Sequence, residues 1–148
     1  MLNIFTPEYF MKEALKEAQK AFEKEEVPVG AVVVANKTII ARAHNLTQQL
    51  NDVTAHAEML AITSATNTIG GKYLNDCQIY ITLEPCVMCA GALFWAQIGE
   101  IYFGASDDKR GAGRLQENIY HPKSKIFRGI LEQDCSNIVK TFFSQKRK

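Results

Sequence analysis

Long apolar runs and a basic, apolar leader are both missing from this 148-residue sequence. No stretch approaches the roughly 20 apolar residues that a membrane-spanning helix needs, and the first residues do not resemble a secretory signal. We therefore expect a cytoplasmic protein without a membrane segment. Repeats, low-complexity tracts and linkers are missing too, and 47% of the residues are hydrophobic. One domain with a substantial core is therefore expected over residues 1–148.

The sequence has almost no excess of positive over negative charge, and it has few cysteines. The formal net charge is only +1, which excludes a basic surface over the whole chain. Basic residues do gather locally, at Lys109, Arg110 and Arg114 and in the run Lys146-Arg147-Lys148, although such clusters are usually solvated surface. Four cysteines fit a reducing compartment better than a disulfide framework.

Two short motifs bring metal-ligating residue types together. His56 and Glu58 form a His-x-Glu pair, and Cys86 and Cys89 follow Pro85 in a Pro-Cys-x-x-Cys run. A structural zinc site uses four protein ligands, whereas a catalytic site uses three and leaves one position for water. We therefore predict that His56, Cys86 and Cys89 bind zinc and that Glu58 moves protons. Motifs of this kind in this order are typical of zinc-dependent nucleobase deaminases.

The chemistry of deamination explains why these residue types are needed. Water must attack a ring carbon, and zinc lowers the pKa of a bound water from 15.7 to roughly 7. A neighbouring carboxylate can take the water's proton, protonate the ring nitrogen and later protonate the departing ammonia. Glu58 is the predicted shuttle.

The spacing of both motifs predicts two helix N-termini that face one ion. Cys86 and Cys89 are three residues apart and share a helix face, and Pro85 suits a first turn. His56 and Glu58 are two apart, so they converge only at a helix start, for which residues 51–54 supply capping side chains.

A Cys-x-x-Cys run alone leaves other interpretations open. It is equally compatible with a redox pair or with half of a structural zinc site, and Cys77, Cys135, His44 and His121 could supply further ligands. The conjunction with His-x-Glu favours a deaminase site. We expect Cys77 and Cys135 to be buried core residues.

The remaining sequence predicts alternating strands and helices. A capped helix starts at Thr6-Pro7-Glu8 and ends near Lys24. Strands are expected at residues 27–34, 38–43, 78–83 and 100–104, the first two forming an antiparallel hairpin and the later ones pairing in parallel through helical crossovers. Residues 106–125 are expected to form a long functional loop.

A last helix is predicted from Glu132, with an apolar stripe at helical spacing. Core packing is the default interpretation of such a stripe, and a place for Phe142 or Phe143 near the pocket is the alternative. The stripe consists of Cys135, Ile138, Val139, Phe142 and Phe143.

Three runs resemble the bacterial tRNA-specific adenosine deaminases. They are Thr54-Ala55-His56-Ala57-Glu58, Leu83-Glu84-Pro85-Cys86-Val87-Met88-Cys89-Ala90-Gly91-Ala92 and Glu26-Val27-Pro28-Val29-Gly30-Ala31. The resemblance implies a cytidine deaminase-like α/β/α fold in three layers, with a mixed five-stranded sheet whose first hairpin is antiparallel. It also implies a homodimer with one Zn²⁺ per subunit. The implied reaction converts the wobble adenosine of an arginine tRNA anticodon loop to inosine, with zinc-bound hydroxide attacking C6.

The same resemblance implies a set of substrate-binding residues. Asn45 matches an asparagine that contacts the flipped nucleoside, although an asparagine after a strand is usually a turn residue. Asp107 matches a residue of the RNA-contacting loop, and the basic cluster beside it then becomes a phosphate contact. The other matching positions are Val27, Pro28, Leu83, Glu84, Phe142 and Phe143.

Two departures and two alternative functions accompany this resemblance. Val53 replaces the proline that is common before Ala-His-Ala-Glu, and residues 111–128 are shorter than in the best-known members. A deaminase of a free base or nucleoside, such as guanine or cytosine, could share the scaffold. A non-catalytic zinc-stabilised RNA-binding module is the other alternative, and the spare carboxylate of Glu58 argues against it.

Overall fold

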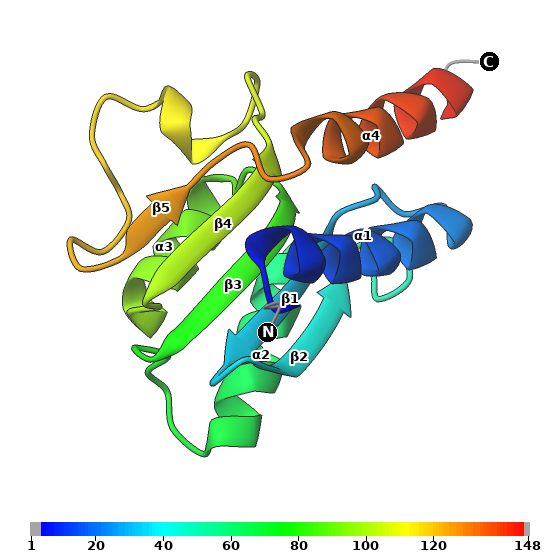
Figure 1. The fold of residues 1–148 in the computed structure, drawn as a ribbon. Helices are drawn as coiled ribbons and strands as arrows, with labels where there is room; N and C mark the ends of the chain where they lie inside the picture. Colours follow the sequence, from blue (N-terminus) through cyan, green and yellow to red (C-terminus); the bar gives the residue numbers. More distant parts are fainter. Residues whose placement is uncertain (1–3, 147–148) are drawn as a thin grey trace.

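The structure is a computed structural model that describes residues 4–146, and its centre is a five-stranded sheet in the order β2-β1-β3-β4-β5 (Figure 1). The elements are α1 (Pro7–Glu23), β1 (Gly30–Ala35), β2 (Thr38–His44), α2 (Ala57–Ile69), β3 (Cys77–Leu83), α3 (Val87–Ala96), β4 (Glu100–Ala105), the short 3₁₀ helix η1 (Ala112–Arg114), β5 (Lys125–Phe127) and α4 (Glu132–Lys146).

The sheet is mixed, as predicted, but one predicted pairing differs. β1 pairs antiparallel with both β2 and β3, whereas β3, β4 and β5 pair in parallel. The crossover through α2 therefore joins two strands that run in the same direction but have β1 between them. Because β3 and β4 are parallel, their carboxyl ends meet at one edge, with Leu83 opposite Ala105.

The first hairpin closes at the predicted turn. Asn36 and Lys37 have φ values of 50° and 62°, the left-handed pair that a two-residue hairpin turn favours. β1 starts at Gly30 rather than at Val27, because Pro28 has no N–H to pair and the N–H of Gly30 donates to Thr82 Oγ1 at 3.1 Å. A side chain at Gly30 would collide with the backbone of α1.

Helices cover both faces of the sheet, which gives three layers. α1 and α4 lie on one face, and α2 and α3 lie on the other (Figure 1). Along β1, Ala31 and Val33 belong to the core under α2 and α3, whereas Val32 and Val34 belong to the core under α1. This burial on both sides explains the continuous apolar run of the strand.

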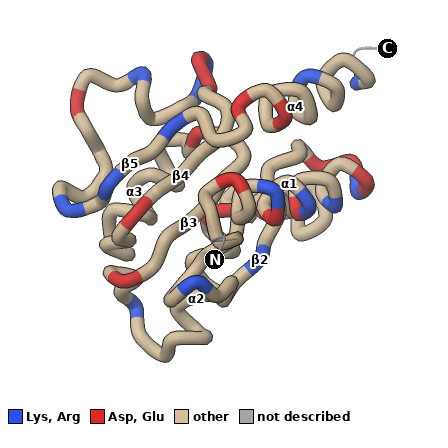
Figure 2. Tube along the Cα trace, viewed as in Figure 1, with Lys and Arg blue, Asp and Glu red and all other residues tan. Residues whose placement is uncertain are grey.

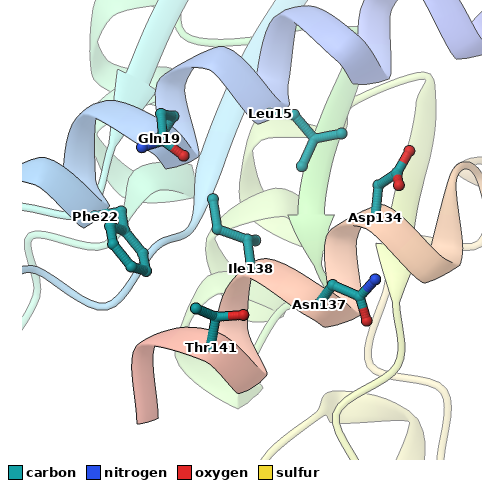
Figure 3. A pocket seen from close by; sticks show the side chains of 7 residues that line it. All are labelled: Leu15, Gln19, Phe22, Asp134, Asn137, Ile138 and Thr141. Atoms are coloured by element: carbon teal, nitrogen blue, oxygen red, sulfur yellow. The ribbon is translucent and has the colours of Figure 1, made fainter. Parts of the chain in front are cut away.

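α4 packs on α1 along a narrow contact. The rings of Phe22 and Phe142 meet edge to face at 5.9 Å, and a shallow groove runs between the two helices (Figure 3). Cys135 and Phe142 are the buried residues of α4, whereas Phe143 is 41% exposed. Of the predicted apolar stripe, only Cys135 and Phe142 are therefore buried in the core.

Basic and acidic residues are mixed along the trace of the described chain (Figure 2). Within residues 4–146, no helix is both long and apolar enough to cross a membrane.

Candidate metal centre and pocket

The two motifs meet at two helix N-termini. His56 is the N-cap residue of α2, and Cys86 is the N-cap residue of α3, with Cys89 in the first turn of that helix. Both caps have extended backbone, and neither side chain caps its own helix. His56 and Cys86 are therefore free to point at a common centre, beside the positive ends of two helix dipoles.

The spacing of the three donor atoms fits a zinc ion. Nδ1 of His56 lies 3.7 Å from Sγ of Cys86 and 3.5 Å from Sγ of Cys89. Zinc at its usual distances to nitrogen and sulfur, with tetrahedral angles, places such atoms about 3.6 Å apart. The three donors form a metal-binding group among the described residues.

The electrostatics of this group also suit a cation. The pKa of Cys86 is lowered to about 4 by the hydrogen bond from Cys89 and then by that from His56. The pKa of Cys89 is raised, because its thiol donates to Cys86 and is buried. Two thiolates this close repel each other, so both ionise together only when a cation lies between them.

Glu58 lies in the first turn of α2 beside this group. It is 4% exposed, and burial raises its pKa to about 7. A carboxyl group of this kind can both accept and donate a proton near neutral pH.

The predicted capping segment has a different role. Asp52 accepts hydrogen bonds from the backbone N–H of Thr54 at 2.8 Å and from its hydroxyl at 2.7 Å. These residues therefore shape the turn before α2, while His56 takes the cap position itself. The carboxylate satisfies the nearest N–H, which lies upstream of the helix.

A pocket of about 800 Å³ opens beside the metal-binding group. Of the predicted substrate-binding residues, Val27, Asn45, Leu83, Glu84, Asp107 and Phe143 line it. Pro28 and Phe142 are buried and are not among its lining residues. Lys109 and Arg110 reach it from the predicted loop, whereas Arg114 does not. Arg147 and Lys148 of the basic terminal run lie outside the described residues.

Asn45 lies in the wall of the pocket and also serves a turn. Its Nδ2 donates to the carbonyl of Val27 at 3.2 Å, and its Oδ1 accepts from the N–H of Thr47 at 3.3 Å. These two hydrogen bonds fix the side chain beside Val27 on the pocket wall.

Sequence reasoning missed two contributions to the pocket. Glu26 is fully buried, and its carboxylate accepts from the N–H groups of Gln48 and Gln49 at 3.0 and 2.8 Å, so it holds the turn that follows Asn45. Ser136 and Lys140 line the pocket from α4. The helical spacing of apolar residues predicts only the apolar positions of α4, and no motif in the sequence indicates a role for Ser136 or Lys140.

The comparisons with known proteins agree with this site. Residues 5–105 match the family model for the cytidine and deoxycytidylate deaminase zinc-binding region. The tRNA-specific adenosine deaminase of Bacillus subtilis (strain 168) is 45% identical over 146 residues, covering 95% of this chain and 91% of the relative.

Two solved structures of deaminases are also similar to this chain. A structure from a study of A-to-I editing by tRNA:A34 deaminases at the wobble position of transfer RNA has a TM-score of 0.82 and 42% identity, covering 88% of this chain and 98% of the other. A guanine deaminase from Bacillus subtilis has a TM-score of 0.64 and 39% identity, covering 67% of this chain and 64% of the other.

These findings confirm the predicted cytidine deaminase-like fold and the predicted cofactor. The donor set and the matching zinc-binding region together assign one Zn²⁺ to each subunit. The chain belongs to the cytidine and deoxycytidylate deaminase family and, within it, to the tRNA-specific adenosine deaminases.

Proposed function

We propose that this protein converts the wobble adenosine of a tRNA anticodon to inosine by hydrolytic deamination. The observation that carries the proposal is the buried carboxyl group of Glu58 beside a three-donor zinc site, at the edge of a pocket large enough for a nucleoside. The names of the relatives at 42–45% identity support the same substrate.

The residues of the site have distinct proposed roles. His56, Cys86 and Cys89 would hold the zinc ion, which when bound supplies a Lewis acid that makes water a nucleophile near neutral pH. Glu58 takes one proton from the attacking water and delivers it to the ring nitrogen. It then takes the second proton from the hydroxyl group added to C6 and gives it to the amino group, which leaves as ammonia as the carbonyl forms. Burial keeps its pKa high enough for both transfers.

The walls of the pocket would hold an extruded base. Val27 and Leu83 offer apolar contact, Asn45 offers an amide and the partly exposed Phe143 offers a stacking surface. Single-stranded RNA loops are usually recognised through such unstacked bases. The basic side chains that line the pocket, Lys109, Arg110 and Lys140, are placed for the flanking phosphates.

An activity assay tests the proposal. Zinc-loaded protein is incubated with an arginine tRNA anticodon stem-loop carrying a wobble adenosine and, separately, with adenosine, guanine and cytosine. We expect inosine in the RNA and no ammonia from the free compounds. Ammonia from guanine alone would instead favour the function named for the Bacillus subtilis guanine deaminase. A second stem-loop with a wobble adenosine but another anticodon tests the proposed preference for arginine tRNA.

We also propose that residues 1–148 act as one domain in a homodimer. Val87, Met88 and Trp95 share one face of α3, and Trp95 is 76% exposed. Gly91 lies on the same face with open space around it, so a second copy could approach closely. A tRNA substrate would place this dimer in the cytoplasm.

Analytical ultracentrifugation tests the dimer. Wild type should sediment as a dimer and Trp95→Glu as a monomer, because a buried charge would oppose association. Tyr9→Glu, a change at an exposed aromatic residue of α1 in the opposite layer, should remain a dimer. A monomeric wild type would refute this part of the proposal.

A further inference from the structure

The carboxylate of Glu84 is turned away from solvent and holds a loop. The residue is 6% exposed. Its Oε1 accepts from the N–H of Asp107 at 3.0 Å, and its Oε2 accepts from the N–H of Gly113 at 2.8 Å. The two oxygens therefore fasten two points of the segment 106–114, six residues apart in the chain.

Two glycines make this close approach possible. A Cβ at Gly113 would lie 2.5 Å from Oε2 of Glu84, and a Cβ at Gly111 would lie 2.5 Å from Oε1. Both distances are too short for any side chain, so the loop backbone packs directly against the carboxylate.

The same loop is joined to the segment that carries the metal ligand Cys86. The backbone N–H of Glu84 donates to the carbonyl of Ala105 at 2.8 Å, and the N–H of Ala112 donates to the carbonyl of Pro85 at 2.9 Å. Cys86 and Gly111 form an isolated antiparallel bridge. The loop is thus anchored along the three residues that precede α3.

The first half of this loop also forms a wall of the pocket. The lining residues that it contributes are Ser106, Asp107, Asp108, Lys109 and Arg110. Within the loop, the carboxylate of Asp107 accepts from the N–H groups of Lys109 and Arg110, both at 3.1 Å. The placement of the two basic residues therefore depends on where Asp107 is held.

We propose that Glu84 is a positioning residue that holds the segment 106–114 against the start of α3 and thereby sets the RNA-facing wall of the pocket. This assigns the carboxylate to the loop rather than to the substrate. The expected effect on RNA rests on the proposed function, whereas the expected effect on the loop does not.

The ion pair of Glu84 is a minor part of this arrangement. Nη1 of Arg128 lies 3.7 Å from Oε2, and the Arg128 side chain is 52% exposed and stacks over the ring of Phe103. The pair is long, and solvent around the half-exposed guanidinium weakens it, whereas buried hydrogen bonds to a carboxylate are costly to lose. Arg128→Gln is therefore a matched control that removes the charge and leaves both backbone hydrogen bonds.

Hydrogen exchange on the zinc-loaded full chain is the first test. In Glu84→Gln one backbone N–H faces an amide NH₂ and loses its acceptor, so amide exchange at Asp107 and Gly113 should accelerate on the order of 10- to 100-fold. Arg128→Gln should stay near wild type, and zinc content should not change. Unaltered exchange in Glu84→Gln would overturn the proposal, whatever the substrate proves to be.

Kinetics on the anticodon stem-loop is the second test. KM should rise about tenfold in Glu84→Gln while kcat stays within about threefold, the pattern of lost binding that is equal in ground and transition states. In Gly113→Ala the new methyl group displaces the same carboxylate oxygen, so KM should rise and kcat should change little, as in Glu84→Gln. The double variant should raise KM little beyond either single variant. Gly71→Ala, with open space around it, is the glycine control. A fall in kcat with an unchanged KM would contradict the assignment.

Discussion

Two buried glutamates, Glu58 and Glu84, line the pocket, and a third, Glu26, holds the turn after Asn45; the hydrogen-bond partners of each carboxyl group separate their roles. Glu26 and Glu84 each accept two backbone N–H groups from a loop, which fixes them as acceptors. Glu58 lies instead beside the metal ligands, where burial raises its pKa to about 7. All three glutamates lie in runs that resemble the family, but only the motif of Glu58 indicates what its carboxyl group does. A glutamate alone in a sequence does not reveal which N–H groups will reach it.

Glu58→Gln should retain one zinc per subunit and lose turnover. The amide keeps the shape of the side chain but cannot take the proton of the attacking water, so we expect a fall in kcat on the order of 10²- to 10⁴-fold. Metal analysis and single-turnover deamination measure the two effects. Near-normal turnover would remove Glu58 from the mechanism, whereas lost zinc would make it part of the metal site.

The cysteines should divide into two classes by reactivity. Burial raises the pKa of Cys135 to about 12 and also raises that of Cys77. Both thiols therefore stay protonated near neutral pH, and the reactive thiolate forms only as the pH approaches the raised pKa. With iodoacetamide followed by peptide mass spectrometry, neither should react in the folded protein. Zinc chelation should expose the partly buried Cys86 first. Modification of folded Cys135 would contradict this expectation.

At the scale of the elements, α4 shows why a helical apolar stripe is ambiguous. Its spacing correctly predicts a helix, and both Cys135 and Phe142 are buried. Val139 and Phe143 line the pocket instead. The helical spacing of apolar residues identifies which side chains share a face of α4. It does not tell whether that face packs in the core or lines a binding pocket, because both environments favour apolar side chains.

The adjacent rings of α4 provide a matched pair of substitutions. Phe142→Ala removes a ring packed against Phe22 and should lower the free energy of unfolding by about 3 kcal/mol. Phe143→Ala removes a 41% exposed ring and should change stability by less than about 1 kcal/mol while weakening binding of the stem-loop. Urea unfolding and RNA titration measure these quantities. Equal stability losses would contradict the division of α4.

At the scale of the whole molecule, polar contacts tie α1 to the first hairpin. Arg42 of β2 donates to Glu13 at 2.9 Å, and Nδ1 of His44 lies 3.0 Å from Glu17. Burial raises the pKa of Glu17, but hydrogen bonds with Lys20 and His44 outweigh it and leave that pKa below the usual 4.5. The outer layer is thus joined to the edge of the sheet close to Asn45.

The depressed pKa of Glu17 makes stability depend on pH. The unfolded chain takes up this proton first, so the contribution is complete above about pH 4.5 and is lost as the pH falls through the lower folded pKa. Glu17→Gln should therefore be less stable than wild type at neutral pH, and the difference should shrink in acid. Denaturant unfolding at each pH measures it, with the exposed Glu23→Gln as control. A constant difference would refute the linkage.

By itself the sequence determined the features that are local. The His-x-Glu and Pro-Cys-x-x-Cys motifs, the two helix N-termini, the hairpin turn and the periodicity of the strands each depend on residues within a few positions of each other. Tertiary structure alone decided that β1 lies between β2 and β3, that α4 divides between core and pocket, and that Glu84 binds a loop more than twenty residues away. The physical reason is that a side chain carries its capacity to pack or accept hydrogen bonds in its own chemistry, but its partner is chosen by which distant backbone the fold brings beside it.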